Sequence, residues 1–324
     1  MAVKKVGVLT SGGDAPGMNA AVRSVVRCGL AAGFKMYGIY DGYKGLLNGE
    51  IEEFTTRNVC DILSRGGTVL STARCNEFKE LEYQKKGAEI ARKFGLDAIV
   101  VIGGDGSFMG ARALSNLGIL TIGIPGTIDN DIACSEYTIG YDTALNTAME
   151  AIDKIRDTMT SHNRCCLVEV MGRNAGYLAL NIAVATGAET ALIPEKEFDL
   201  QRDVIEPVKV AKAAGKKNHI IIVAEGVDID VMQVAKQVEE ATGMSTRASV
   251  LGHIQRGGNP TCRDRVTASQ MGQRAIELLQ EGKSSRVVCI KDGKISDIDI
   301  NEGLAMEKKK IDEEEFLLSQ MLAF

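Results

Sequence analysis

The sequence predicts an α/β protein made of two open, mostly parallel, three-layer αβα domains of Rossmann-like architecture. Short apolar runs the length of buried strands alternate with longer helical stretches, which is typical of βαβ units and a parallel sheet. Most of these runs end in glycine-rich turns, and glycine contributes 35 of the 324 residues, well above the usual share of about 7 %. At roughly 150 residues per domain, the length also indicates two domains.

The elements can be placed in order from these runs. A first strand at Val3–Leu9 precedes a helix whose apolar residues recur at helical spacing until Gly33 closes it. A long helical pattern extends from Asp142 to about Thr160 and places a domain boundary near residue 141. The other predicted elements are strands at Ala98–Ile102, Ile119–Ile124, Cys165–Val170, Ile220–Ala224 and Ala248–Leu251, a helix near 107–117, and a surface helix at the charged tail Glu307–Glu315, docked by Phe316, Leu317 and Leu318.

The composition is that of an ordinary globular protein, with 45 % apolar and 25 % charged residues. Lys and Arg number 38 and Asp and Glu 43, so the net charge is −5, which argues against a general nucleic-acid or membrane binder. No apolar run approaches the roughly 18 residues of a membrane span. The first residues lack the apolar stretch of a signal peptide, so we expect a cytoplasmic protein.

The eight cysteines show no pattern of a metal or redox site. No pair has C-x-x-C spacing, and the chain has only three histidines, none of them clustered with cysteine. This argues against zinc binding and thiol redox chemistry. The cysteines are therefore interpreted as small, buried apolar residues.

The glycine-rich turns indicate phosphate binding, because the free N–H groups and the dipole of a following helix attract anions. Two common forms of such a turn are absent. The only Gly-Lys-Ser, Gly282–Ser284, has Glu277 where Walker A needs its first glycine. Ser11–Gly17, which follows the first strand, does not fit the dinucleotide fingerprint G-x-G-x-x-G. A different phosphate chemistry is therefore indicated.

Three other segments carry suitable groups, each with a plainer alternative. Gly103–Ser107 sets Asp105 among three glycines, where it could hold Mg²⁺ against a polyphosphate or simply cap a helix. Thr127–Asp131 places two carboxylates two residues apart, suited to taking a proton from a hydroxyl or to a polar turn. Arg256, with Arg247 and His253 nearby, suits a phosphate ester or forms a solvated loop.

Together these segments resemble the bacterial ATP-dependent 6-phosphofructokinase family. The resemblance covers about the first 300 residues, and the last twenty or so are much less telling. It rests on Gly7–Asn19, Arg65–Thr68, Gly103–Ser107, Pro125–Asp131, Val168–Arg173 and Val250–Gly258.

The resemblance implies that the two domains bind different substrates. A larger domain, 1–141 plus about 254–304, would bind ATP, a smaller one, about 142–253 plus 305–324, would bind fructose 6-phosphate, and the active site would lie in the cleft between them. Mg²⁺ would be the cofactor, with Asp105 as its contact. The implied ATP residues are Gly12, Arg74, Cys75, Gly104, Asp105, Gly106 and Ser107.

It also implies the residues of catalysis. Asp129 would be the general base toward the sugar 1-hydroxyl, and Thr127 and Arg173 would stabilise charge on the transferring group. Arg164 and Arg247 would reach the 6-phosphate of a neighbouring subunit, so a homotetramer is expected. The full implied substrate set is Thr127, Ile128, Asp129, Arg164, Met171, Gly172, Arg173, Glu225, Arg247, His253, Ile254, Gln255 and Arg256.

Donor choice and regulation follow from further positions. Pyrophosphate-dependent relatives usually carry Asp at the position of Gly106 and Lys at that of Gly126, so two glycines here favour ATP. Activation by ADP and inhibition by phosphoenolpyruvate are expected, although Thr56 and Ala214 stand where arginine and lysine occur in other members. The implied effector residues are Arg23, Arg27, Asp61, Arg156, Gly187, Glu189, Lys216 and Lys217; charges on a solvent-facing helix are the alternative for the first two.

Several rival functions remain on the sequence alone. The nearest is a pyrophosphate-dependent phosphofructokinase. A kinase acting on NAD or lipids could share the Gly-Gly-Asp-Gly turn, but it would not explain Pro125–Asp131 or Val250–Gly258. A non-catalytic nucleotide-sensing subunit would be free to lose Asp105, Asp129 or Arg164, all of which are present. An oxidoreductase is opposed by the missing dinucleotide fingerprint.

Overall fold

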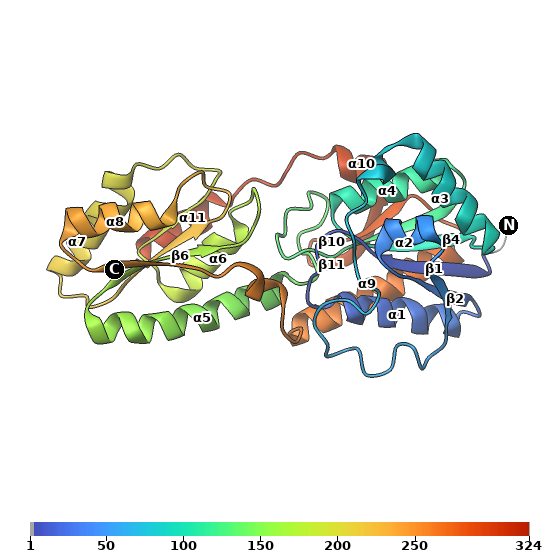
Figure 1. The fold of residues 1–324 in the computed structure, drawn as a ribbon, viewed down its shortest axis with the longest axis horizontal. Coiled ribbons are helices and arrows are strands. Elements are labelled where there is room, and N and C mark those ends of the chain that lie inside the picture. Colours follow the sequence, from blue (N-terminus) through green and yellow to red (C-terminus); the bar gives the residue numbers. More distant parts are fainter. Residues whose placement is uncertain (1–2, 324) are drawn as a thin grey trace. The chain divides into compact units, whose positions relative to one another are not determined.

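The computed structural model describes residues 3–323, which fold as two compact units; the predicted domain limits at residues 1 and 324 lie outside this range. The larger unit comprises the chain up to Ile128, Ile132–Thr143 and Arg256–Lys309. The smaller unit comprises Asp129–Asp131, Ala144–Gln255 and the chain from Lys310 onward. Both units contain a mostly parallel sheet packed against helices (Figure 1), so the predicted fold class is confirmed.

The larger unit is built on a seven-stranded sheet in the order β11-β10-β5-β4-β1-β2-β3. Its five central strands are parallel, and the two edge strands, β3 and β11, are antiparallel to their neighbours. The strands are β1 (Lys5–Thr10), β2 (Lys35–Ile39), β3 (Ile51–Phe54), β4 (Ala98–Gly103), β5 (Leu120–Pro125), β10 (Arg286–Lys291) and β11 (Lys294–Asp299).

Helices cover both faces of this sheet, which is why β4 can be apolar throughout. On one face α1 and α9 pack together, and the Ser24 hydroxyl donates to the Ser269 carbonyl between them at 2.6 Å. On the other face α2, α3 and α4 cover the sheet (Figure 1). The helices are α1 (Met18–Ala31), α2 (Gly42–Asn48), α3 (Leu81–Lys93), α4 (Asp105–Asn116), α9 (Cys262–Gln280) and α10 (Ile300–Ala305), with a 3₁₀ turn at Asn76–Lys79.

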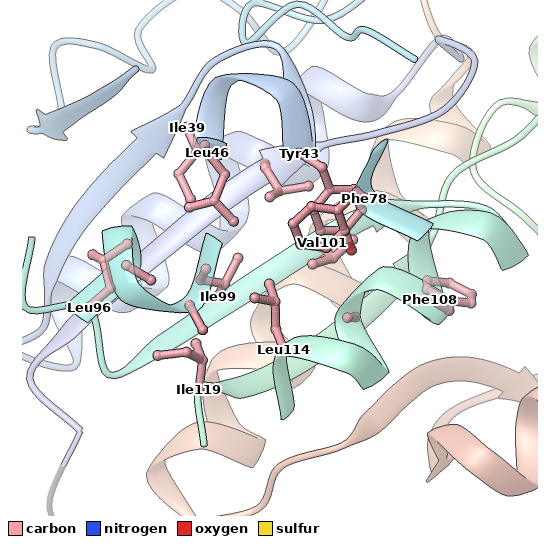
Figure 2. Close-up of a cluster of buried hydrophobic side chains, with 14 of the residues drawn as sticks. Ile39, Tyr43, Leu46, Phe78, Leu96, Ile99, Val101, Phe108, Leu114 and Ile119 are labelled. Carbon is pink, nitrogen blue, oxygen red and sulfur yellow. The ribbon is translucent and has the colours of Figure 1, made fainter. Parts of the chain in front are cut away.

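Figure 2 shows the core on the second face. Ile39, Ile99 and Val101 project from the strands and meet Leu46, Phe108 and Leu114 from the helices. Burial of each such side chain contributes about 1.5–3 kcal/mol. The Tyr43 and Phe78 rings stack with centroids 4.3 Å apart, and they lie close to the start of α4. The core therefore holds the start of α4 firmly.

The smaller unit has a four-stranded, all-parallel sheet in the order β7-β8-β6-β9. Its strands are β6 (Cys165–Val170), β7 (Thr190–Leu192), β8 (His219–Ala224) and β9 (Thr246–Val250). The core on one face joins Leu167 and Ile221 to Val208 and Val238. The helices are α5 (Tyr141–His162), which begins in the larger unit, α6 (Tyr177–Thr186), α7 (Glu206–Ala213), α8 (Val231–Thr242) and α11 (Glu313–Met321), with short turns at Gln201–Ile205 and Gly252–Arg256.

The tail helix differs from its prediction. The helix α11 begins only at Glu313, after a non-helical charged segment that Asp312 ends as an N-cap. Leu317 and Leu318 stay 55 % and 43 % exposed, so the expectation that they dock the helix is wrong. Phe316, the third residue of that prediction, is half-buried, with the Lys196 ammonium 5.3 Å from its ring centroid. Polar contacts also hold α11, since Glu313 pairs with Lys196 and Glu315 accepts from the Asn181 amide at 2.6 Å.

The cysteines are only partly the buried residues that were predicted. Cys165, Cys166 and Cys289 are buried, but Cys60 and Cys262 are exposed. Cys262 is the first residue of α9 and Cys60 lies in a turn segment after β3, where neither side chain faces a core. Within residues 3–323, no group of three or more His, Cys, Asp or Glu residues is placed to hold a metal ion. No described helix is long and apolar enough to cross a bilayer.

Candidate active site

The strand order of the larger sheet places two glycine turns at one edge. From β1 the chain moves to β2 on one side and later returns to β4 on the other, so the order reverses between β1 and β4. Ligands of open α/β sheets bind outside the carboxyl ends of the strands at such a reversal. Ser11–Gly13 follows β1 and Gly103–Ser107 follows β4, which puts both turns at this point.

The two turns touch each other closely. The Ser11 N–H donates to the Ile102 carbonyl at 2.9 Å. A Cβ on Gly103 would lie 2.3 Å from the Ser11 carbonyl oxygen, so no side chain fits there. Gly12 has a φ of +90°, which L side chains rarely adopt. The glycines are therefore required to bring two backbone turns together.

A third segment joins this edge of the sheet. The Thr72 hydroxyl donates to the Gly12 carbonyl at 2.8 Å, which brings the chain of Arg74 and Cys75 toward the β1 turn. The Arg74 side chain is exposed and Cys75 is half-buried. Burial raises the pKa of the Cys75 thiol, and nearby Glu77 adds to the effect. The predicted ATP residues thus lie on adjoining segments of one unit.

The start of α4 is suited to an anion. Asp105 and Gly106 are the first helical residues and are exposed, and the Tyr43 hydroxyl braces the turn by donating to the Ser107 carbonyl at 2.5 Å. The helix dipole and the N–H groups of this first turn favour negative charge. Asp105 is the residue here that could hold a magnesium ion, because Mg²⁺ in proteins is bound through one or two carboxylates together with substrate phosphates.

The loop after β5 is fastened to the same edge. The Gly126 N–H donates to the Gly103 carbonyl at 3.0 Å. The Thr127 N–H donates to the Ile139 carbonyl at 3.1 Å, and the Thr138 hydroxyl donates to the Thr127 carbonyl at 2.7 Å. Thr127 therefore has both backbone groups bound by the segment around residue 139.

The acidic residues of this loop belong by their contacts to the smaller unit. Asp129 is only 4 % exposed, and Asn130 has a left-handed φ of 51° that turns the chain between the two carboxylates. Asp131 is half-buried near Tyr177. Burial raises the pKa of Tyr177 to about 12, with Glu195 and Asp131 adding to the effect. The two predicted acidic residues thus have unequal surroundings.

The carboxyl ends of β6 and β8 carry several of the candidate substrate residues of the smaller unit. One carboxylate oxygen of Glu225 accepts from the Arg173 N–H at 2.7 Å and from the Gly172 N–H at 3.3 Å. Arg173 has a φ of 59°, and its side chain is exposed. Glu225 therefore shapes the loop that presents the Arg173 guanidinium.

Gln255 also shapes this loop. Its side chain is fully buried, and its Oε1 accepts from the Met171 N–H at 2.8 Å. Its neighbours His253 and Ile254 are exposed on the short turn before it. The buried amide therefore supports the loop at Met171 through its backbone. The resemblance implied Gln255 as a substrate residue but did not indicate this hydrogen bond.

Arg256 lies in the larger unit against the β1 turn. Its guanidinium donates to the Asp14 carbonyl at 3.0 Å. A Cβ on Gly13 would lie 2.4 Å from one guanidinium nitrogen, so the glycine makes room for the arginine. This contact places Arg256 at the edge of the larger sheet that carries the glycine turns, whereas Arg247 and His253, the other members of the predicted basic cluster, belong to the smaller unit.

Arg164 and Arg247 lie at the other end of the small sheet, near the amino end of β6. Arg164 directly precedes β6, and Arg247 pairs in register with Cys166 near the start of that strand. Met171 and Arg173 follow the other end of β6, which is six residues long. At about 3.3 Å per residue, the backbones of the two sets are roughly 20 Å apart. The two sets therefore lie at opposite ends of β6.

The predicted effector residues fall into two groups. Arg23, Arg27 and Asp61 are in the larger unit, and the others are in the smaller one, where Arg156 donates to Asn218 at 2.9 Å. There the members come from α5, from the turn between α6 and β7, and from the segment before β8; they are Arg156, Gly187, Glu189, Lys216 and Lys217.

Glu189 in this second group is fully buried and already bound. Its carboxylate lies 2.8 Å from the Lys216 ammonium and 3.0 Å from His219 Nδ1, and it accepts from the Ile220 N–H at 2.6 Å. Burial alone would raise the pKa of Glu189, but His219 and Lys216 hold that pKa below its ordinary value. His219 had no distinguishing signal in the sequence, because a histidine that begins an apolar strand looks like an ordinary core residue.

The strand reversal, the touching glycine turns and the adjoining helix start define a two-unit α/β protein with a sheet edge suited to phosphate. Residues 5–279 match the family described as Phosphofructokinase. The chain belongs to the phosphofructokinase family.

Close relatives extend along the whole chain. An ATP-dependent 6-phosphofructokinase of Clostridium tetani is 56 % identical over 322 residues, and one of Clostridium botulinum is 54 % identical over 321; each comparison covers 99 % of this chain and 100 % of the relative. The solved structure of Pichia pastoris phosphofructokinase in the T-state is 37 % identical with a TM-score of 0.89. That comparison covers 94 % of this chain and 36 % of the Pichia chain.

Proposed function

We propose that this chain is a glycolytic kinase that transfers the γ-phosphoryl group of ATP to the 1-hydroxyl of fructose 6-phosphate, giving fructose 1,6-bisphosphate and ADP. The observation that carries the proposal is the 54–56 % identity, over 99 % of the chain, to ATP-dependent 6-phosphofructokinases. The touching glycine turns after β1 and β4 support a phosphate donor at this edge of the larger sheet.

The nucleotide would bind to the larger unit. The turn at Gly12 and the first turn of α4, Gly104–Ser107, would line the phosphates, with Arg74 and Cys75 on the adjoining segment. The Mg²⁺ that accompanies ATP would contact Asp105 and offset phosphate charge.

The chemical step would use Asp129 as the general base. Its carboxylate takes the proton of the 1-hydroxyl while the hydroxyl oxygen bonds to the γ-phosphorus. The bond from that phosphorus to the bridging oxygen breaks, and ADP leaves with the electron pair. Arg173 and the Thr127 side chain would stabilise charge on the group in transit. Burial of Asp129 supports this role, because a base shielded from water acts on the bound alcohol alone.

Fructose 6-phosphate would be held by the smaller unit, by the loop at 171–173, Glu225, and the turn of His253 and Ile254, together with Arg256 of the larger unit. Arg164 and Arg247 lie about 20 Å from this loop along β6, which supports their serving a neighbouring subunit's sugar phosphate. Sharing of residues between copies requires an oligomer, and we propose the homotetramer that the resemblance implies. We also propose that the protein is cytoplasmic.

The assignment is tested by supplying the purified protein with fructose 6-phosphate and either ATP or pyrophosphate. We expect fructose 1,6-bisphosphate with MgATP and no measurable product with pyrophosphate. Product formed from pyrophosphate alone would establish the nearest rival. No product from either donor, despite nucleotide binding, would indicate a non-catalytic sensor instead.

Donor choice is further tested at Gly106. A Cβ there has nothing within 4 Å, so Gly106→Asp should fold normally. Its carboxylate would face the nucleotide phosphates, and we expect the KM for ATP to rise at least about tenfold through charge repulsion. Gly106→Asn is the matched control, because it has the same shape without the charge. Equal KM values for the two variants would show that charge at position 106 does not select the donor.

Effector control is a further part of the proposal. We expect ADP to lower, and phosphoenolpyruvate to raise, the fructose 6-phosphate concentration needed for half-maximal velocity. Thr56 and Ala214 are both exposed, so Thr56→Arg and Ala214→Lys can restore the cations found in other members. Each should tighten the response to ADP by at least about tenfold, at about 1.5–3 kcal/mol per charged hydrogen bond. Ala213→Lys, one residue away and also exposed, is the control. Velocity curves that do not change with ADP or phosphoenolpyruvate would contradict the proposed effector site.

A further inference from the structure

Asp264 is a fully buried carboxylate that the proposed reaction does not use as an acid, a base or a ligand. One oxygen accepts from the Tyr137 hydroxyl at 2.6 Å and from the Gly140 N–H at 2.8 Å. The other accepts from the Thr143 N–H at 2.9 Å and from the Thr143 hydroxyl at 2.5 Å. Four donors from one short segment therefore converge on a single side chain about 120 residues away in sequence.

The place of Asp264 in its helix explains why its carboxylate is available to accept hydrogen bonds from the segment 137–143. Asp264 is the third residue of α9, after the N-cap Thr261. An acidic residue at that position usually turns back to the N–H of the N-cap residue. Here the Thr261 N–H donates to the Thr143 hydroxyl at 3.0 Å instead. Thr143 thus completes the helix cap, and the Asp264 carboxylate is directed to the segment 137–143.

That segment in turn holds Thr127. The Thr138 hydroxyl donates to the Thr127 carbonyl at 2.7 Å, and the Thr127 N–H donates to the Ile139 carbonyl at 3.1 Å. The Ile139 N–H in turn donates to the Pro125 carbonyl at 3.0 Å. Tyr137 and Gly140, which flank these two residues, are the ones that donate to Asp264. Every link from Asp264 to Thr127 lies within the larger unit.

We propose that Asp264 is a positioning residue for phosphoryl transfer: its carboxylate holds residues 137–143 against Thr127 and so sets the place of the loop that carries Asp129. The catalytic part of this inference rests on the proposed function. A reacting group displaced by about 1 Å can lose a factor of about 100 in rate. The same carboxylate fixes Thr143, after which the chain passes into the smaller unit.

The variant Asp264→Asn tests the role. An amide offers one acceptor oxygen and one NH₂ group, so in either orientation the NH₂ faces a backbone N–H, that of Gly140 or of Thr143. The hydroxyls of Tyr137 and Thr143 can rotate to accept, but an N–H cannot. We expect kcat to fall by about 10- to 100-fold, with the KM values for ATP and fructose 6-phosphate each within about threefold of the unmodified enzyme.

Two controls separate positioning from stability. Leu278→Ala removes a fully buried side chain near the other end of α9, and should lower the Tm without changing kcat measured well below that temperature. Should Asp264→Asn fail to fold, the positioning role is tested instead by comparing Thr143→Ala with Thr143→Ser. The alanine variant should lose about tenfold in kcat, and the serine variant, which keeps the hydroxyl, should retain at least about half.

Hydrogen exchange gives a readout that does not depend on activity. In Asp264→Asn the amides of Thr127 and Ile139 should exchange at least about tenfold faster, while those of Val100 and Val101 in β4 stay unchanged. An enzyme without activity toward ATP and fructose 6-phosphate would defeat the proposed function. The exchange rates would still test whether Asp264 holds residues 137–143 against Thr127. Unchanged exchange at Thr127, or a kcat that falls no more than in Leu278→Ala, would overturn the inference.

Discussion

Replacing Asp129 with asparagine is expected to lower kcat by at least about 100-fold while leaving the binding of ATP and fructose 6-phosphate largely intact. The amide has nearly the same shape as the carboxylate but cannot accept the proton of the 1-hydroxyl. Asp129 is almost completely buried, so water has little access to replace it as the base. The check is steady-state kinetics together with calorimetric titration of fructose 6-phosphate.

Asp131→Asn is the matched control for this variant. Asp131 lies two residues further along the same loop, is half-buried, and is not proposed to take the proton. The loss of kcat should therefore be much smaller than for Asp129→Asn. Near-normal turnover in Asp129→Asn, or equal losses in the two variants, would contradict the role given to Asp129.

Removal of both Arg164 and Arg247 should raise the KM for fructose 6-phosphate by a factor of 100 or more. Each charged hydrogen bond to a phosphate is worth about 1.5–3 kcal/mol, and a tenfold change in affinity corresponds to about 1.4 kcal/mol. The KM for ATP should change little, because neither arginine belongs to the larger unit. An unchanged KM for the sugar phosphate would leave the two arginines as surface charges.

Mixed oligomers then test whether these arginines serve a neighbouring subunit. In each smaller unit they lie about 20 Å from the loop of Arg173, at the other end of β6. Co-expressing the Asp129→Asn chain with the double arginine variant would rebuild complete sites from two defective chains. About a quarter of the sites in a random mixture should be complete. Recovery of no activity would place both arginines in their own chain's site.

Much of the fold could be read from local pattern. The apolar runs that became β1, β4, β5, β6 and β8 are buried strands of the two sheets, and strands of a parallel sheet covered on both faces are typically continuous apolar runs. The short edge strands gave no such signal. β3 alternates only weakly and β7 has three residues, so each is a strand because a neighbour supplies hydrogen bonds.

The α11 helix shows the limit of composition as a guide. Its apolar residues suggested a docked face, but Leu317 and Leu318 remain exposed. Whether an apolar side chain on a short helix is covered depends on what packs beside it, and here the partners Lys196 and Asn181 are polar. The site residues proposed from the resemblance remain predictions, to be decided by the variants above.

By itself the sequence determined which groups can carry the chemistry and where along the chain they stand, because a glycine that must accept a left-handed φ, or a carboxylate at a strand end, is a local property. Only the tertiary structure decided what holds those groups in place. Three side chains accept hydrogen bonds from backbone N–H groups that are distant in sequence. Glu225 accepts from Arg173, Gln255 from Met171 and Asp264 from Gly140. Such acceptors carry no pattern of their own, because a hydrogen bond is defined by where the fold brings its two ends.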